Sequence, residues 1–306
     1  AALRDRDFEL ASMLIEAGAE VDVDIKRGRP FVIDAIEKQD AEMIDFLFSH
    51  GADVEYRGAF PISAFAVAAS LDNFELMQRC LKEGADVDTR GESGNPLLIE
   101  AVMEENPKKT RLLLENGADV NILCVENRRM ELTALSHAFD QGSSIVENLL
   151  FEHGANANVN GVSGEPLIVQ SIAENDLVAA QRFLEEGANP DVMNKDGCTP
   201  LAIAVAEEEL NAVELLIEAG ADPSLSGAGM ESPLLLAIEN GNIAIAHMLI
   251  VSGAKFDKQR MLARAYSERN TPLMSLLLNA GADPESTLWK TDERVFDIAV
   301  RDGSTG

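Results

Sequence analysis

A Gly-Ala pair recurs along the whole chain and constrains its fold more than any other feature of the sequence. The pair begins at Gly18, Gly51, Gly84, Gly117, Gly154, Gly187, Gly220, Gly253 and Gly281. The intervals between successive pairs are 33, 33, 33, 37, 33, 33, 33 and 28 residues. A repeated interval of this length indicates stacked copies of one supersecondary unit, none of which can bury its apolar face alone. One array can therefore occupy all 306 residues without a single central core.

Each Gly-Ala pair predicts the end of a helix. Apolar residues stand three and four positions upstream of every Gly, as Ile217 and Leu216 do before Gly220, and further apolar residues precede them at helical spacing. A Gly just past the last turn adopts a left-handed conformation that other residues enter only with strain, so we predict a helix C-cap at each pair. His50 and His153 each precede such a Gly, where an imidazole favours the negative end of the helix.

The start of the unit is clearest at Thr199-Pro200-Leu201. Threonine caps a helix whose first position is Pro, where the missing N–H costs nothing. We predict a first helix that runs to about Glu208, a short break, and a second helix from about Asn211 to Ala219.

The Thr-Pro-Leu start, the paired helices, the Gly-Ala-Asp end and the 33-residue period together resemble the ankyrin repeat, over essentially the whole chain. The resemblance implies an all-α fold with short β-hairpin fingers, a solenoid of paired antiparallel helices. We expect one array over residues 1–306, with about eight complete repeats and partial units at 1–18 and 284–306. The His that follows Pro-Leu in the family, and usually ties neighbouring fingers together, is absent throughout.

Two units, 118–154 and 254–281, depart from the period. The longer one has four extra residues, which fit in the finger at 121–130; the shorter one lacks five and has no room for a hairpin. In the shorter unit we predict that Asp257 begins the first helix and Thr271 the second.

Two further stretches differ from the common plan. After Gly51, Pro61 comes early and Phe65 to Ala68 stand in place of a polar break, which predicts a longer helical part. Trp289 and residues 292–300 predict the first helix of a further unit.

Charge and cysteine content bound the partners and the compartment. The chain has 25 basic and 53 acidic side chains, a net charge of −28 spread over its length. Nucleic acids and acidic membranes require Lys and Arg, so we expect neither as a partner, and a protein segment of net positive charge fits best. The three cysteines form no close pair, which indicates a reducing compartment, the cytoplasm or the nucleus. No apolar run is long enough for membrane insertion, and a chain that opens inside a unit without Met indicates a fragment of a longer protein.

Catalytic and metal-binding motifs are missing from the sequence. Neither His137 nor His247 has a Cys or His at ligand spacing, and no phosphate loop or nucleophile elbow is present. The acidic run at Glu207 to Glu209 lies at the exposed end of a first helix, and we interpret it as a solvated face rather than as a general acid and base. We therefore expect neither enzymatic activity nor a cofactor.

The family binds proteins through its fingers and the concave face formed by its first helices, and this resemblance implies two rows of partner-binding residues. The helix row comprises Glu37, Glu104, Glu105, Glu174, Glu207, Glu208 and Glu239. The finger row comprises Lys26, Arg27, Tyr56, Arg57, Arg90, Asn127, Arg128, Arg129, Met130 and Lys195. An alternative interpretation is that both rows are ordinary solubilising surface, and that the long finger results from loop drift. Asn121 also resembles the Asn that asparaginyl hydroxylases accept in ankyrin proteins.

Two functions remain open at this stage. The leading hypothesis is a protein-protein interaction module, expected as a monomer, that serves as the recognition arm or scaffold of a larger intracellular protein. The alternative is a structural spacer or intramolecular clamp in a channel, enzyme or effector, with no external ligand of its own.

Overall fold

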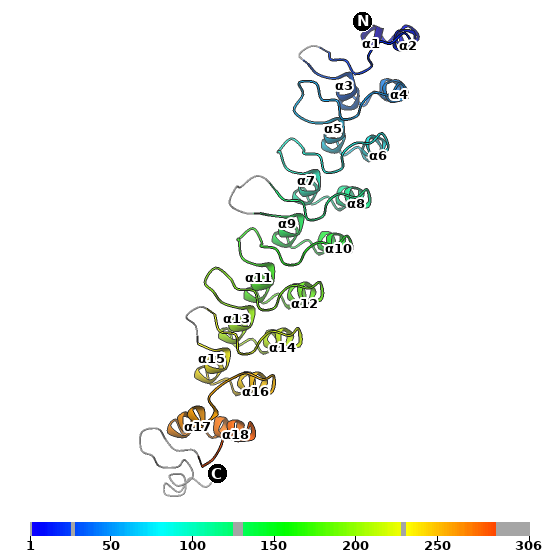
Figure 1. Cartoon of the computed structure of the whole chain (residues 1–306). Helices are drawn as coiled ribbons and strands as arrows, with labels where there is room; N and C mark the ends of the chain where they lie inside the picture. Colours follow the sequence, from blue (N-terminus) through cyan, green and yellow to red (C-terminus); the bar gives the residue numbers. More distant parts are fainter. Residues whose placement is uncertain (1, 26–27, 125–130, 228–230, 286–306) are drawn as a thin grey trace. The chain divides into compact units, whose positions relative to one another are not determined.

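The computed structural model describes residues 2–25, 28–124, 131–227 and 231–285, and these form helices in pairs (Figure 1). The first helices of the complete pairs are seven residues long, except the last, which has ten: α3 (Phe31–Glu37), α5 (Ala64–Ser70), α7 (Leu97–Met103), α9 (Ala134–Asp140), α11 (Leu167–Ala173), α13 (Pro200–Ala206), α15 (Pro233–Glu239) and α17 (Lys258–Ser267). Their partners have nine: α4 (Ala41–Ser49), α6 (Phe74–Lys82), α8 (Pro107–Glu115), α10 (Ser144–Glu152), α12 (Leu177–Glu185), α14 (Leu210–Glu218), α16 (Ile243–Val251) and α18 (Thr271–Asn279). A shorter pair, α1 (Ala2–Asp5) and α2 (Phe8–Glu16), precedes them.

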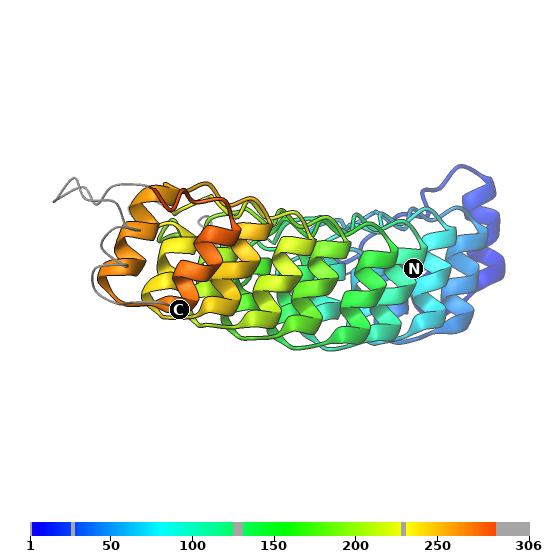
Figure 2. The same cartoon turned by 90° about the horizontal axis from the view of Figure 1, so that it is seen from below.

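The chain divides into two compact units, Ala1–Gly164 and Glu165–Gly306. Within each unit the first helices pack in one layer and the second helices in another, with the helices of a layer side by side (Figure 2). Apolar side chains fill the space between the layers. Ile33, Phe65 and Leu98 are fully or almost fully buried in the first unit, as Phe183 and Leu216 are in the second. This arrangement confirms the predicted solenoid of helix pairs.

The predicted helix ends are confirmed at the second helices. The Gly of each pair has a positive φ, which is 87° at Gly187. There the Ala188 N–H donates to the carbonyl of Phe183 at 2.8 Å and the Gly187 N–H to that of Leu184 at 3.1 Å, a Schellman-type cap. His50 and His153 are the C-cap residues of α4 and α10. In each, the ring Nδ1 lies within 2.9 Å of a carbonyl oxygen of the last helical turn.

A second left-handed position, which the sequence analysis did not predict, separates the two helices of each pair. Seven residues other than Gly have a positive φ there: Arg6, Gln39, Asp72, Glu105, Asn175, Glu208 and Arg269. Gly142 and Gly241 occupy the same place in the other two pairs. The next residue is the N-cap of the second helix, and in most pairs its side chain accepts a helix N–H, as the Asp40 carboxylate does from Met43 at 3.2 Å.

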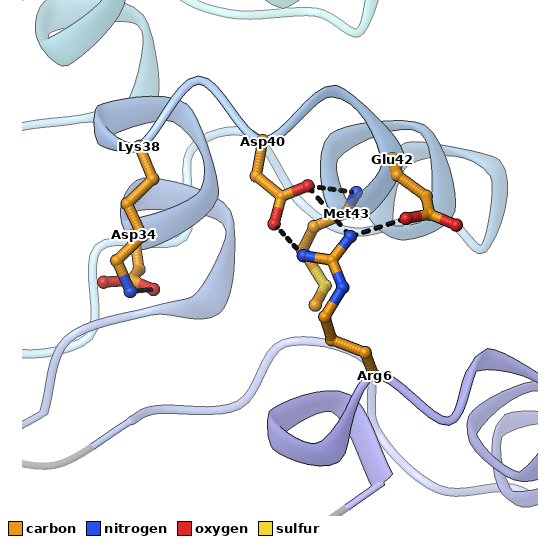
Figure 3. Close-up of polar contacts among 6 residues, drawn as sticks. All are labelled: Arg6, Asp34, Lys38, Asp40, Glu42 and Met43. Carbon is orange, nitrogen blue, oxygen red and sulfur yellow. Dashed lines mark hydrogen bonds and ion pairs between the residues drawn. The ribbon is translucent and has the colours of Figure 1, made fainter.

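Arg6 shows how this turn joins neighbouring pairs. Its guanidinium forms an ion pair with Asp40 and lies 2.5 Å from Glu42 in α4 (Figure 3). The hydrogen bond from Arg6 is the main reason that the pKa of Asp40 is lowered. The capping carboxylate therefore stays ionised while it accepts the helix N–H.

Three sequence predictions are corrected by the described residues. The helical part after Gly51 is not longer: α5 has seven residues, because Ser63 caps it by accepting the Ala66 N–H at 3.2 Å and Leu71 ends it in phase with the other units. The fingers are loops rather than regular hairpins, with single bridges at Asp24–Pro30 and Arg90–Pro96. The first helix after Thr199 ends at Ala206 rather than near Glu208, because Glu208 takes the left-handed conformation.

The irregular unit near the C-terminus follows its prediction. Asp257 caps α17 and the next helix, α18, begins at Thr271, so no finger precedes the first helix of this pair. The helix predicted at 292–300, together with Trp289, lies outside the described residues.

Candidate protein-binding surface

The seven glutamates of the helix row lie at the C-terminal ends of the first helices or in the turns that follow, and all are exposed. Glu37, Glu104 and Glu105 belong to the first unit, and Glu174, Glu207, Glu208 and Glu239 to the second. The row therefore comprises two separate sets, one in each unit. Glu105 and Glu208 are themselves left-handed turn residues, with φ of 53° and 59°.

Three of the seven carboxylates already pair with cations of the chain. Glu37 forms an ion pair with Arg29, which also lies 4.9 Å over the ring of Phe60. Glu239 pairs with Arg264 of α17 at 3.2 Å. Glu239 also forms a hydrogen bond with Glu231, and this bond raises the pKa of Glu231. Glu37 and Glu239 therefore take part in contacts between neighbouring elements.

Glu104 pairs with a buried lysine. The side chain of Lys109 is only 4% exposed, and its Nζ lies 2.6 Å from Glu104 and 2.7 Å from Asp72. Burial by itself lowers the pKa of Lys109, but hydrogen bonds to the two carboxylates outweigh burial and raise it. The ammonium stays charged and joins the turn after α5 to the turn after α7. Sequence reasoning missed this role because Asp72, one of the two carboxylates, stands in the preceding repeat.

The remaining four glutamates, Glu105, Glu174, Glu207 and Glu208, have no ion-pair partner among the described residues. Glu174 accepts a hydrogen bond from the neutral side chain of Gln170 at 3.0 Å. Three of the four, Glu174, Glu207 and Glu208, directly follow α11 and α13, successive first helices that pack against each other in the second unit.

The finger residues within the described ranges are mostly occupied by local contacts. Arg57 donates to the buried Thr89 at 3.2 Å and to Glu55 at 3.1 Å. Arg90 donates to the carbonyl of Gly94 at 2.9 Å, inside its own finger. These arginines stabilise fingers, and only their exposed edges could reach a partner.

Tyr56 and Lys195 complete the described part of the finger row. Partial desolvation, together with the nearby carboxylate of Asp24, raises the pKa of Tyr56. Lys195 is exposed and lies 3.4 Å from Glu165. The other predicted finger residues, Lys26, Arg27, Asn127, Arg128, Arg129 and Met130, lie outside the described residues.

A ladder of side-chain acceptors joins the bases of successive fingers. Each acceptor stands four residues after the Gly of a Gly-Ala pair and accepts a hydrogen bond from a backbone N–H of the next repeat. The bonds, of 2.8 to 3.0 Å, run from Asp53 to Asp22, Asp86 to Glu55, Asp119 to Asp88, Asn156 to Asn121, Asp222 to Asp191 and Lys255 to Ser224. Asn121 also donates to the carbonyl of Gly154 at 3.2 Å. Asn121 therefore helps to hold its own repeat against the next repeat.

The described residues give little support for metal binding, cysteine chemistry or membrane insertion. No group of three or more His, Cys, Asp or Glu residues could hold a metal ion there. The cysteines are unpaired, and burial raises the pKa of the Cys80 thiol to about 12, which leaves it unreactive at neutral pH. No helix in this part of the chain has the length and apolar character that crossing a bilayer requires.

Stacked helix pairs with fingers define a repeat protein of the solenoid class. Comparison with known proteins agrees. A family model described as "Ankyrin repeats (3 copies)" matches residues 65–161, 135–227 and 167–260. The chain belongs to the ankyrin-repeat family, whose members are generally protein-protein interaction modules and typically have no enzymatic activity.

A solved structure gives the same result. The crystal structure of an ankyrin repeat domain from Acinetobacter baumannii AYE, at 1.00 Å resolution, is similar to this chain with a TM-score of 0.51 and 26% sequence identity. The match covers 62% of this chain and 98% of that domain. No curated protein matches the sequence.

Proposed function

We propose that this chain is the recognition arm or scaffold of a larger intracellular protein and that it binds a protein segment carrying Lys or Arg. The observation that carries the proposal is the set of carboxylates Glu174, Glu207 and Glu208, which follow α11 and α13 and have no ion-pair partner among the described residues. We name this set the acidic patch. It lies at the C-terminal ends of first helices, where the negative ends of the helix dipoles also favour cations.

Charge explains why the acidic patch suits a cationic segment. Three neighbouring carboxylates without a cation repel one another in a chain whose net charge is already −28. A bound Lys or Arg would relieve this repulsion and would be steered toward the patch by the field of the whole molecule. Lys195, in the finger before α13, supports a partner of mixed but mainly positive charge. The proposed partner is a flexible basic segment, and the proposed activity is binding without catalysis.

Charge reversal tests the proposal. A library of Lys- and Arg-containing peptides is screened against the whole chain, and the best binder is titrated by fluorescence anisotropy at low and high salt. Glu207→Lys with Glu208→Lys should weaken binding by about tenfold and flatten the salt dependence, because each lost ion pair contributes up to about 1 kcal/mol and repulsion is added. Lysine and glutamate enter the left-handed conformation of position 208 at a similar cost, so the substitution should not alter the turn.

A matched control uses two exposed glutamates of α14 in the same repeat. Glu214→Lys with Glu218→Lys changes the net charge by the same amount but lies on the second helix. The proposal predicts nearly unchanged binding for this control. Equal loss in both double variants would leave only a net-charge effect, and an absence of any peptide binder would favour the spacer or intramolecular clamp.

A further inference from the structure

The first unit has a groove on its second-helix layer, away from the first-helix ends. The groove has a volume of about 350 Å³ and runs across α6, α8 and α10. Its apolar lining includes Phe74 of α6, Pro107 and Leu112 of α8, and Ile145 of α10. Ile145 is 64% exposed, so most of its side chain is open to contact from outside. An apolar side chain from a partner could therefore become buried against Ile145.

The polar edge of the groove carries positive charge. Lys108 and Arg111 of α8 line it and are exposed. Lys108 forms no ion pair among the described residues, and the Arg111 guanidinium forms an ion pair at 3.9 Å with Glu115, a carboxylate that also lines the groove. In a chain of net charge −28 this combination of two exposed cations and apolar surface stands out. Its charge is complementary to a carboxylate-bearing partner, not to a basic one.

The position of Lys108 in its helix adds to this contrast. The other second helices of the first unit have an acidic residue in the first turn, Glu9, Glu42, Glu75 and Glu147. In α8 the first turn has none and contains Lys108 and Lys109 instead. A cation near a helix N-terminus is unfavourable for the helix. Lys109 is compensated by Asp72 and Glu104, whereas Lys108 is not compensated by any described carboxylate.

We propose that this groove is a second docking surface, which binds an acidic segment of another protein through one inserted apolar side chain. The apolar side chain would lie between Phe74, Pro107 and Ile145, and carboxylates of the segment would pair with Lys108 and Arg111. This surface is distinct from the acidic patch in location and in the charge it selects. The chain would then hold a basic segment in one unit and an acidic segment in the other.

Two synthetic peptides test the docking surface. In the first peptide Asp and Glu alternate with Leu and Phe, and in the second Lys replaces the acidic residues. Binding of each to the whole chain is measured by fluorescence anisotropy. The acidic peptide should bind the wild-type chain, and Lys108→Glu with Arg111→Glu should weaken that binding by about tenfold. Ile145→Ser, at an exposed position, should weaken it as well.

Stability and a matched charge control complete the test. Lys108→Glu should leave the thermal midpoint unchanged or raised, since it restores an acid to the first turn of α8. Lys255→Glu with Arg260→Glu reverses two exposed cations of the second unit and should leave acidic-peptide binding unchanged. No binding of the acidic peptide, or equal binding by the wild type and the Lys108/Arg111 variant, would overturn the proposal. A concentration-dependent dimer that Lys108→Glu abolishes would overturn it too, because a second copy would then occupy the groove.

Discussion

Single residues at two turns set where the helices of each repeat end. Gly187 and its counterparts end the second helix in a left-handed conformation, and a further left-handed residue such as Glu208 separates the two helices of a pair. The first position is visible in the sequence because Gly is retained at it. The second could not be predicted, because its occupants share neither chemistry nor size.

Gly187→Ala isolates the conformational cost of the first position. No atom lies within 4 Å of the place that a Cβ would occupy, so steric overlap with neighbours does not contribute. The variant should lose about 1 kcal/mol of unfolding free energy through strain at positive φ. Chemical denaturation measures this loss. Gly187→Asn is the control and should lose less, since Asn tolerates the left-handed region better; an unchanged midpoint in the Ala variant would contradict the C-cap assignment.

The Arg6 contact with Asp40 predicts a dependence of stability on pH. The pKa of Asp40 is lowered in the folded state, chiefly by the hydrogen bond from Arg6. The contact therefore stabilises the fold above the ordinary Asp pKa of about 3.9, and this contribution is lost as the pH falls through the lowered value. Arg6→Gln should lower the melting temperature at neutral pH. The difference from wild type should shrink in acid, and a difference that is constant with pH would contradict this account.

Helix caps determine how firmly each second helix begins. Asp or Asn caps most of them through a side-chain oxygen, as Asp176 does by accepting the Ala179 N–H at 3.0 Å. Glu209 occupies the corresponding position before α14 but makes no such bond, because its longer side chain does not take the capping geometry.

Glu209→Asn should therefore stabilise the chain by about 1 kcal/mol, since Asn supplies the missing acceptor for the first turn of α14. Thermal or urea denaturation measures the gain. Glu209→Gln serves as the control, because it removes the same charge without shortening the side chain. An equal gain in both variants would show that relief of charge repulsion, not capping, is responsible.

The helix pairs, their caps and the lost finger before α17 were predictable because each depends on neighbouring residues in the sequence. The state of the glutamates was not. Glu37 and Glu104 pair with Arg29 and Lys109 of other elements in the same repeat, and Glu239 pairs with Arg264 of the next repeat, so each pairing depends on how these elements fold together. The groove around Ile145 was missed for the same reason, since three helices contribute to it.

At the scale of the whole molecule, the carboxylates behind the net charge of −28 differ in whether they pair with cations of the chain. Intrachain cations neutralise several acids of the helix row, while the acidic patch of the second unit keeps its charge. The ladder at the finger bases, which includes Asp191 and Asn121, stabilises stacking without using the first-helix ends. The proposed function therefore assigns binding to Glu174, Glu207 and Glu208, which have no ion-pair partner among the described residues.

The most direct measurement is zero-length carboxylate-to-amine cross-linking of the whole chain to the Lys-containing peptide that it binds best, followed by mass spectrometric mapping. Carboxylates in contact with a peptide lysine form an amide bond, whereas distant ones do not. The account predicts that the cross-links concentrate on Glu174, Glu207 and Glu208. Cross-links on Glu214 and Glu218, or an even distribution over the exposed acids, would contradict it.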